Sequence, residues 1–163
     1  PCQDTVFVTQ NCSENNPKQP IHKQKQICIP AKISQMKNKI LVIDDELSIR
    51  LLLENFLSKS YEVICKSDGQ EALEWLEGNL PDLIICDLQM PNIDGYLFLE
   101  KIRQRGYTKH TPVIMLSGVE SSKERVKCYR IGAQDFLAKP FNPEELSELI
   151  LKNLKPIHYA LEW

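Results

Sequence analysis

The sequence predicts an α/β fold in which a parallel sheet carries helices on both faces. From residue 39 onward, five short apolar runs alternate with five segments of helical periodicity. The runs are almost continuously apolar, which is typical of strands buried on both faces of a parallel sheet. Each crossover between neighbouring strands is expected to be right-handed.

Apolar periodicity and turn residues locate the elements along the chain. The predicted strands are residues 40–43, 61–66, 82–86, 112–116 and 135–138, and the predicted helices are residues 49–57, 69–76, 95–105, 121–131 and 142–154. Spacings of three and four residues select the side chains that should face the core. They are Ile49, Leu52, Leu53, Phe56 and Leu57 in the first helix, Leu97, Phe98 and Ile102 in the third, and Val126 and Ile131 in the fourth.

Capping residues mark two of the helix ends. Asn142 is the expected N-cap of the last helix, because Pro143 then occupies the first helical position and two glutamates fall in the first turn. Gly78 is the expected C-terminal cap of the second helix.

Composition limits the class of protein. The chain has 163 residues, of which 42% are hydrophobic and 26% charged, as in an ordinary soluble domain with a tail. A net charge of -2 predicts no direct nucleic-acid partner and no membrane partner. Six cysteines without a C-x-x-C pair argue against a zinc site. Without a long apolar run or a signal-peptide pattern, the expected location is cytoplasmic.

The chain divides into three segments. Residues 1–36 are rich in Gln, Asn, Pro and Lys, and we expect an N-terminal extension that is poorly ordered or packs only locally. Residues 37–155 contain all the predicted elements and are expected to form the globular domain. Residues 156–163 are expected to form a short tail.

Polar residues follow four of the predicted strands. The run 83–86 leads directly into Asp87, and a turn with Met-Pro and Asp-Gly comes next. Asp44–Asp45, Ser117 and Lys139 stand at the same place after three other strands. Singly, each would be taken for a turn, cap or solvent-facing residue. Because the carboxyl ends of parallel strands meet in one crevice, we expect them to form one site.

The residue types at this site suit phosphoryl chemistry. Three crowded carboxylates repel one another unless a cation is present, and hard oxygen ligands suit Mg²⁺. Lys139 supplies a compact positive charge, and Ser117 and the Gly118 amide supply hydrogen-bond donors for phosphoryl oxygens. An aspartate beside Mg²⁺ is a competent nucleophile toward phosphorus. The site therefore predicts an aspartyl phosphate.

Four motifs in order carry a resemblance to a known family. They are Ile-Leu-Val-Ile-Asp-Asp-Glu at 40–46, Leu-Ile-Ile-Cys-Asp-Leu-Gln-Met-Pro-Asn-Ile-Asp-Gly at 83–95, Val-Ile-Met-Leu-Ser-Gly at 113–118 and Asp-Phe-Leu-Ala-Lys-Pro-Phe at 135–141. Residues 39–154 resemble the receiver domain of two-component response regulators. The resemblance implies a flavodoxin-like (CheY-like) five-stranded parallel sheet of order 2-1-3-4-5.

The resemblance also assigns the chemical roles. Asp87 is implied as the phosphoacceptor and Lys139 as the contact to its phosphorylated form. Mg²⁺ is implied to bind Asp45, supported by Asp44, together with Asp87 and the backbone carbonyl of Gln89.

The remaining assignments concern switching. Ser117 is implied as the hydroxyl that turns toward the phosphoryl group, and Phe136 as the aromatic residue that changes rotamer with it. The Lys139–Pro140 peptide is implied to be cis. Gln89 and Val119 hold the two positions that modulate loss of the phosphoryl group in this family.

The implied function is a phosphorylation-activated signalling switch. A histidine kinase or phosphotransfer protein donates the phosphoryl group, and the surface of helix 121–131, strand 135–138 and helix 142–154 signals to a downstream protein or forms a homodimer. The domain is not an enzyme beyond its own phosphoryl transfer and dephosphorylation. A docking module that is never phosphorylated, or a receiver fragment of a larger response regulator or hybrid histidine kinase, are alternatives.

Two enzyme classes are less compatible with the sequence. A phosphatase with an aspartate nucleophile needs an Asp-x-Asp pair on the first strand, whereas Asp44 and Asp45 are adjacent. A nucleotide-binding enzyme needs a glycine-rich phosphate loop, and neither G-x-G-x-x-G nor G-x-x-x-x-G-K-[ST] occurs.

Overall fold

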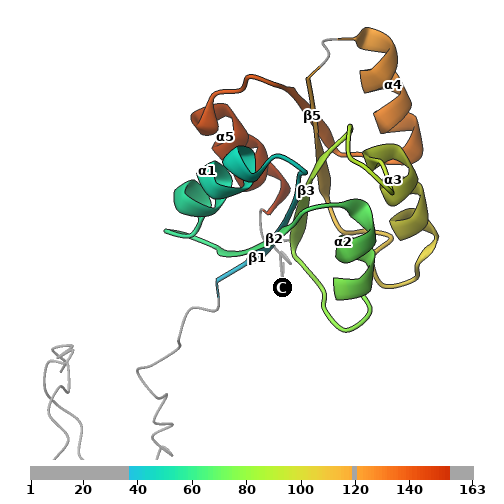
Figure 1. Ribbon diagram of the computed structural model, residues 1–163, viewed down its shortest axis with the longest axis horizontal. Helices are drawn as coiled ribbons and strands as arrows, with labels where there is room; N and C mark the ends of the chain where they lie inside the picture. The colour runs from blue at the N-terminus through green and yellow to red at the C-terminus, as the bar shows by residue number, and fades with distance from the viewer. Residues whose placement is uncertain (1–36, 119–120, 155–163) are drawn as a thin grey trace, which may run out of the picture. The chain divides into compact units, whose positions relative to one another are not determined.

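The computed structural model describes residues 37–118 and 121–154. Strands and helices alternate along this part of the chain (Figure 1). The strands are β1 (Lys39–Ile43), β2 (Glu62–Lys66), β3 (Leu83–Asp87), β4 (Val113–Ser117) and β5 (Asp135–Ala138). The helices are α1 (Leu47–Leu57), α2 (Gly69–Trp75), α3 (Gly95–Gln104), α4 (Ser122–Ile131) and α5 (Pro143–Asn153).

The strands form one parallel sheet in the order β2-β1-β3-β4-β5. Helices α1 and α5 cover one face, and α2, α3 and α4 cover the other (Figure 1). β3 lies in the centre, with β1 and β4 as its neighbours. The predicted fold class and strand order are both confirmed.

Two hydrophobic cores, one on each face, explain the continuous apolar runs. In β1, Ile40 and Val42 pack toward α1 and α5, whereas Leu41 and Ile43 pack toward α2, α3 and α4. All four side chains are fully buried. Because both faces are covered, neither face of the strand keeps polar residues, and the usual alternation disappears.

Three residues predicted to face the core are exposed instead. The exposed fractions are 48% for Leu52, 43% for Leu97 and 46% for Val126. A helix lying on a sheet buries a narrow stripe, so leucines at the margin of the apolar side remain in solvent. Leu99 in α3 and Cys128 in α4 occupy the buried positions that these side chains were expected to fill.

Element boundaries differ slightly from those predicted. β3 and β4 continue through Asp87 and Ser117, so both polar residues are the last residues of their strands. The cap of α2 is Leu76 in right-handed geometry, and Gly78 lies beyond it, so the prediction for Gly78 was wrong. Asn142 caps α5 as predicted, because its side chain accepts the Glu144 N–H. In the ranges described here, no helix has the length and apolarity to cross a bilayer.

Candidate functional site

The site lies at the carboxyl edge of the sheet, where the topology brings separate segments together. Ile43 of β1 pairs with Cys86 of β3, so Asp44 and Asp87, each the next residue along the chain, become neighbours. Carboxylate oxygens of Asp44, Asp45 and Asp87 lie within 4.8 Å of one another. The structure therefore brings together the three carboxylates named from the sequence.

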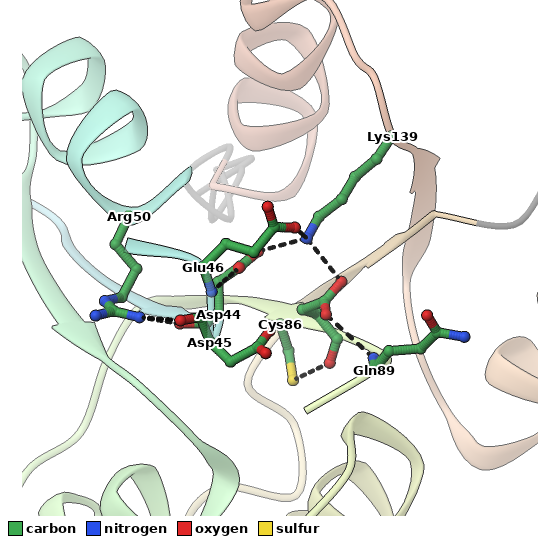
Figure 2. A network of polar contacts seen from close by, with 8 residues as sticks. Asp44, Asp45, Glu46, Arg50, Cys86, Gln89 and Lys139 are labelled. Carbon is green, nitrogen blue, oxygen red and sulfur yellow. Dashed lines mark hydrogen bonds and ion pairs between the residues drawn. The ribbon is translucent and has the colours of Figure 1, made fainter. Parts of the chain in front are cut away.

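Lys139 links these carboxylates from the loop after β5. Its Nζ lies 2.7 Å from Asp44 Oδ2 and 3.0 Å from Asp87 Oδ1 (Figure 2). A third carboxylate, Glu46 Oε1, lies 3.5 Å away on the more exposed side. One cation thus faces three anionic groups, and the site keeps an excess of negative charge.

Burial and charge act in opposite directions on the protonation of this cluster. Desolvation raises the pKa of the Asp44 carboxyl and of the Asp87 carboxyl, and the hydrogen bond and charge of Lys139 offset this only in part. Burial by itself lowers the pKa of Lys139, but hydrogen bonds and charges from Asp44 and Asp87 together outweigh it and raise that pKa. The ionised cluster is therefore short of positive charge.

The turn between β1 and α1 is held by hydrogen bonds on two sides. Asp44 Oδ1 accepts the Glu46 N–H at 2.9 Å. Arg50, in the second turn of α1, donates from Nη1 to the carbonyl oxygens of Asp44 and Asp45 at 2.6 and 2.9 Å. These contacts orient the two aspartates before any ligand binds.

The loop after β3 is held against the strand by its own backbone. Asp87 Oδ2 accepts the Gln89 N–H at 3.1 Å, and the Gly95 N–H donates to the Leu88 carbonyl at 3.0 Å. A Cβ on Gly95 would overlap the backbone carbonyl oxygen of Asp87, so the close return of the chain requires glycine. These contacts fix the loop next to the Asp87 carboxylate, which lies buried at the sheet edge.

Ser117 and Phe136 lie on the other side of Asp87, toward α4. Ser117 is buried, and its Oγ donates to Glu124 Oε2 at 3.3 Å. Phe136 packs in the core and is 9% exposed, and the Arg125 guanidinium lies 5.4 Å from its ring centroid. The peptide between Lys139 and Pro140 is cis. Val119, named from the sequence, lies outside the described residues.

Three charged residues at the site were not anticipated from the sequence. Glu46 contacts Lys139, Glu124 accepts from Ser117, and Arg50 holds the carbonyls of the aspartate pair. Glu46 belongs to the acidic run that begins at Asp44, and Arg50 follows it by four residues, one helical turn. That spacing points the Arg50 side chain back toward the residues before α1, but it does not identify the backbone carbonyls of Asp44 and Asp45 as its acceptors.

The donor set fits a hard divalent cation. Three carboxylates with oxygens inside one 4.8 Å group provide ligands and leave room for water, as Mg²⁺ prefers. The raised pKa values of Asp44 and Asp87 show that the fold alone does not compensate their charge. A cation at this edge would supply the missing positive charge.

Comparison with protein families now identifies the chain. The sequence model described as "Response regulator receiver domain" matches residues 40–151, which is most of the chain. The chain belongs to this family, and the resemblance inferred from its motifs is confirmed.

Curated relatives of the chain include proteins named as transcriptional regulators. The chain is 41% identical over 125 residues to the "Probable transcriptional regulator ycf27" of Porphyridium aerugineum, which covers 76% of this chain and 51% of the relative. It is also 41% identical over 113 residues to the Bacillus subtilis regulator PhoP, covering 69% of this chain and 46% of the relative. The chain therefore spans about half the length of these relatives.

Solved structures agree on the fold. A putative response regulator from Chloroflexus aurantiacus has a TM-score of 0.69 at 37% identity and covers 72% of this chain and 98% of its own. Chemotaxis protein CheY4 of Vibrio cholerae has the same TM-score at 35% identity, covering 72% and 99%. The receiver domain of the sensor histidine kinase PA1611 from Pseudomonas aeruginosa has a TM-score of 0.67 at 28% identity and covers 72% of this chain and 98% of its own. That structure has a magnesium ion coordinated in its active-site cleft.

Proposed function

We propose that residues 37–155 are a receiver domain that accepts a phosphoryl group on Asp87 from the phosphohistidine of a histidine kinase or phosphotransfer protein. The observation that carries this proposal is a buried aspartate at the central strand end, bridged to Asp44 by Lys139. A carboxylate in that position lies at the edge of the sheet and has a cation beside it.

The transfer is a substitution at phosphorus. An Asp87 carboxylate oxygen forms the new P–O bond while the P–N bond to the donor imidazole breaks, and the electron pair leaves with the imidazole nitrogen. Asp45, Asp87 and the Gln89 carbonyl, supported by Asp44, would hold Mg²⁺, which supplies positive charge against the phosphoryl oxygens. Lys139 pairs with the Asp87 carboxylate and remains beside the charge that transfer adds.

Switching follows from the position of Ser117. When its hydroxyl turns toward a phosphoryl group on Asp87, the contact with Glu124 in α4 is lost. Phe136, on the neighbouring strand β5 opposite Met115, then changes rotamer with it. The response therefore begins at the sheet edge and the first turn of α4.

The surface of α4, β5 and α5 is proposed to transmit the signal to a downstream protein or to a second copy of the chain. Three exposed basic side chains lie on α4 (Arg125, Lys127 and Arg130), and three exposed acidic ones lie on α5 (Glu144, Glu145 and Glu148). Gln134, also exposed, lies just before β5. We propose that the domain catalyses only its own phosphoryl transfer and dephosphorylation, that it works in the cytoplasm, and that residues 1–36 and 156–163 flank it as an extension and a tail.

The direct test is phosphorylation by acetyl phosphate, read by intact mass, with and without Mg²⁺. Wild type is expected to gain one phosphoryl group only with Mg²⁺, and Asp87→Asn is expected to gain none. Asp82→Asn is the matched control, because Asp82 directly precedes the amino end of the same strand and its carboxylate accepts the Lys39 N–H. It should be phosphorylated like wild type.

A folded wild-type domain that gains no phosphoryl group would overturn the proposal. The same test with beryllofluoride, a phosphoryl mimic, separates a poor donor from an incompetent site. Failure of both would favour the docking module that acts without phosphorylation.

A further inference from the structure

Arg50 is hydrogen-bonded to the turn before its own helix and does not extend freely into solvent. Its side chain is half-buried, and Nη1 donates to two consecutive carbonyl oxygens, at 2.6 Å for Asp44 and 2.9 Å for Asp45. Charge-assisted hydrogen bonds of this length are among the stronger ones in proteins. The guanidinium therefore holds the backbone of both residues at once.

The two residues that Arg50 holds are the ones whose side chains form the acidic cluster. Asp44 is fixed further by Lys139 and by the Glu46 amide. The Asp45 carboxylate is exposed, and among residues 37–118 and 121–154 it has no hydrogen-bond or ion-pair partner. Its direction therefore depends on its backbone, and Arg50 is the side chain that holds that backbone.

The position of Arg50 also completes the charge distribution. Arg50 and Lys139 approach the acidic residues from opposite sides (Figure 2). Lys139 contacts the carboxylates themselves, whereas Arg50 contacts only carbonyl oxygens. Arg50 thus adds positive charge near the cluster without occupying the oxygens that a cation needs.

We propose that Arg50 is a positioning residue for the Mg²⁺ site, acting through the backbone of Asp44 and Asp45. The inference rests on the proposed function in that it assigns Mg²⁺ to this cluster. Removing a group that orients a metal ligand without binding the metal itself commonly weakens metal binding by about ten- to a hundredfold. If the hydrogen bonds of Arg50 served only the stability of α1, its replacement would leave the Mg²⁺ affinity unchanged.

The test measures Mg²⁺ affinity by calorimetry without a phosphodonor. Arg50→Met is expected to raise the Kd at least about tenfold, and Arg50→Lys, which keeps the charge but not the planar fork, is expected to fall between it and wild type. Arg105→Met is the matched control, because Arg105 is also half-buried and donates to a backbone carbonyl, that of Leu73, far from the site. It should lower the melting temperature and leave the Kd unchanged.

A second measurement uses the metal-free protein. The Glu46 amide is bonded to Asp44 Oδ1, so its hydrogen exchange reports the order of this turn. Exchange should be faster in Arg50→Met and Arg50→Lys than in Arg105→Met at equal global stability. If Arg50→Met does not fold, Arg50→Lys carries both measurements.

The outcomes separate the two proposals. Wild type that binds Mg²⁺ but is not phosphorylated would contradict the proposed function and leave the Arg50 comparison intact. A folded Arg50→Met with wild-type Kd and wild-type Glu46 exchange would overturn the role of Arg50 alone. If wild type bound no Mg²⁺, the metal assignment would fall, and with it the role of Arg50.

Discussion

The buried aspartates at the strand ends carry a cost that the fold does not remove. Asp44 and Asp87 are nearly inaccessible to solvent, at 0% and 4% exposure, and burial raises the pKa of both carboxyls despite Lys139. Ionised carboxylates at these two positions destabilise the fold, because both are desolvated and they repel each other. The arrangement is understandable if the charge serves a ligand.

The pH dependence of stability tests this at the residue level. A carboxyl whose pKa is raised on folding stabilises the folded chain fully below its unfolded value, 3.8, and loses that contribution as pH rises through the folded value. Asp87→Asn, which imitates the protonated form, is therefore expected to raise the unfolding free energy at pH 7 by about 1 kcal/mol. The advantage should shrink as the pH falls toward about 4. Urea denaturation in EDTA measures both.

The control for this prediction is Asp82→Asn, because the Asp82 side chain is exposed. Its unfolding free energy should change little at either pH. An advantage of Asp87→Asn that grew toward acidic pH would contradict the assignment. Adding Mg²⁺ should reverse the order at pH 7, because a cation that binds only the folded wild type stabilises it by mass action.

At the level of single elements, the helix ends differ in how they are capped. The Asn142 side chain accepts the Glu144 N–H at 2.9 Å at the start of α5. Ser121 holds the same position before α4, but its side chain makes no capping hydrogen bond. Asn and Ser are both favoured at the N-cap position, so residue type alone does not distinguish the two helix ends.

Two alanine substitutions separate a cap that is used from one that is not. Asn142→Ala is expected to lower the unfolding free energy by about 1 kcal/mol, because one N-terminal amide of α5 loses its partner. Ser121→Ala is expected to lower it by only a few tenths of that. Chemical denaturation of both variants measures the difference. Equal losses would show that hydrogen bonding does not distinguish the two ends.

At the level of the whole molecule, stability depends on which helix side chains reach the two cores. Leu52 and Leu53 are adjacent in α1, yet Leu53 is fully buried in the core that α1 shares with α5 and Leu52 is 48% exposed. The angle at which α1 lies on the sheet decides between them.

This contrast gives a prediction at the largest scale. Leu53→Ala should lower the unfolding free energy by about 3 kcal/mol, because it leaves a cavity between α1 and the sheet. Leu52→Ala should lower it by less than about 1 kcal/mol, since an exposed leucine loses little buried area. Thermal and urea denaturation compare the two. A larger loss for Leu52→Ala would contradict the observed orientation of α1.

Sequence reasoning located every strand and helix of the described domain, because buried parallel strands and amphipathic helices have different apolar periods. It also brought Asp44, Asp45, Asp87, Ser117 and Lys139 to one edge, since parallel strands end on the same side of a sheet. It was less successful with helix sides: Leu97 and Val126 fit the apolar period but lie in solvent. The apolar period identifies one side of a helix, but it does not tell which residues at the edge of that side are buried.

Only the tertiary structure decided which charged residues complete the site. Arg50, Glu46 and Glu124 read in the sequence as ordinary helix or turn residues, and their contacts depend on where α1 and α4 lie relative to the strand ends. The carboxylates follow from chain order, because each is covalently attached to the end of a strand. The groups that orient and balance them come from helices, whose placement is set by packing across the whole domain.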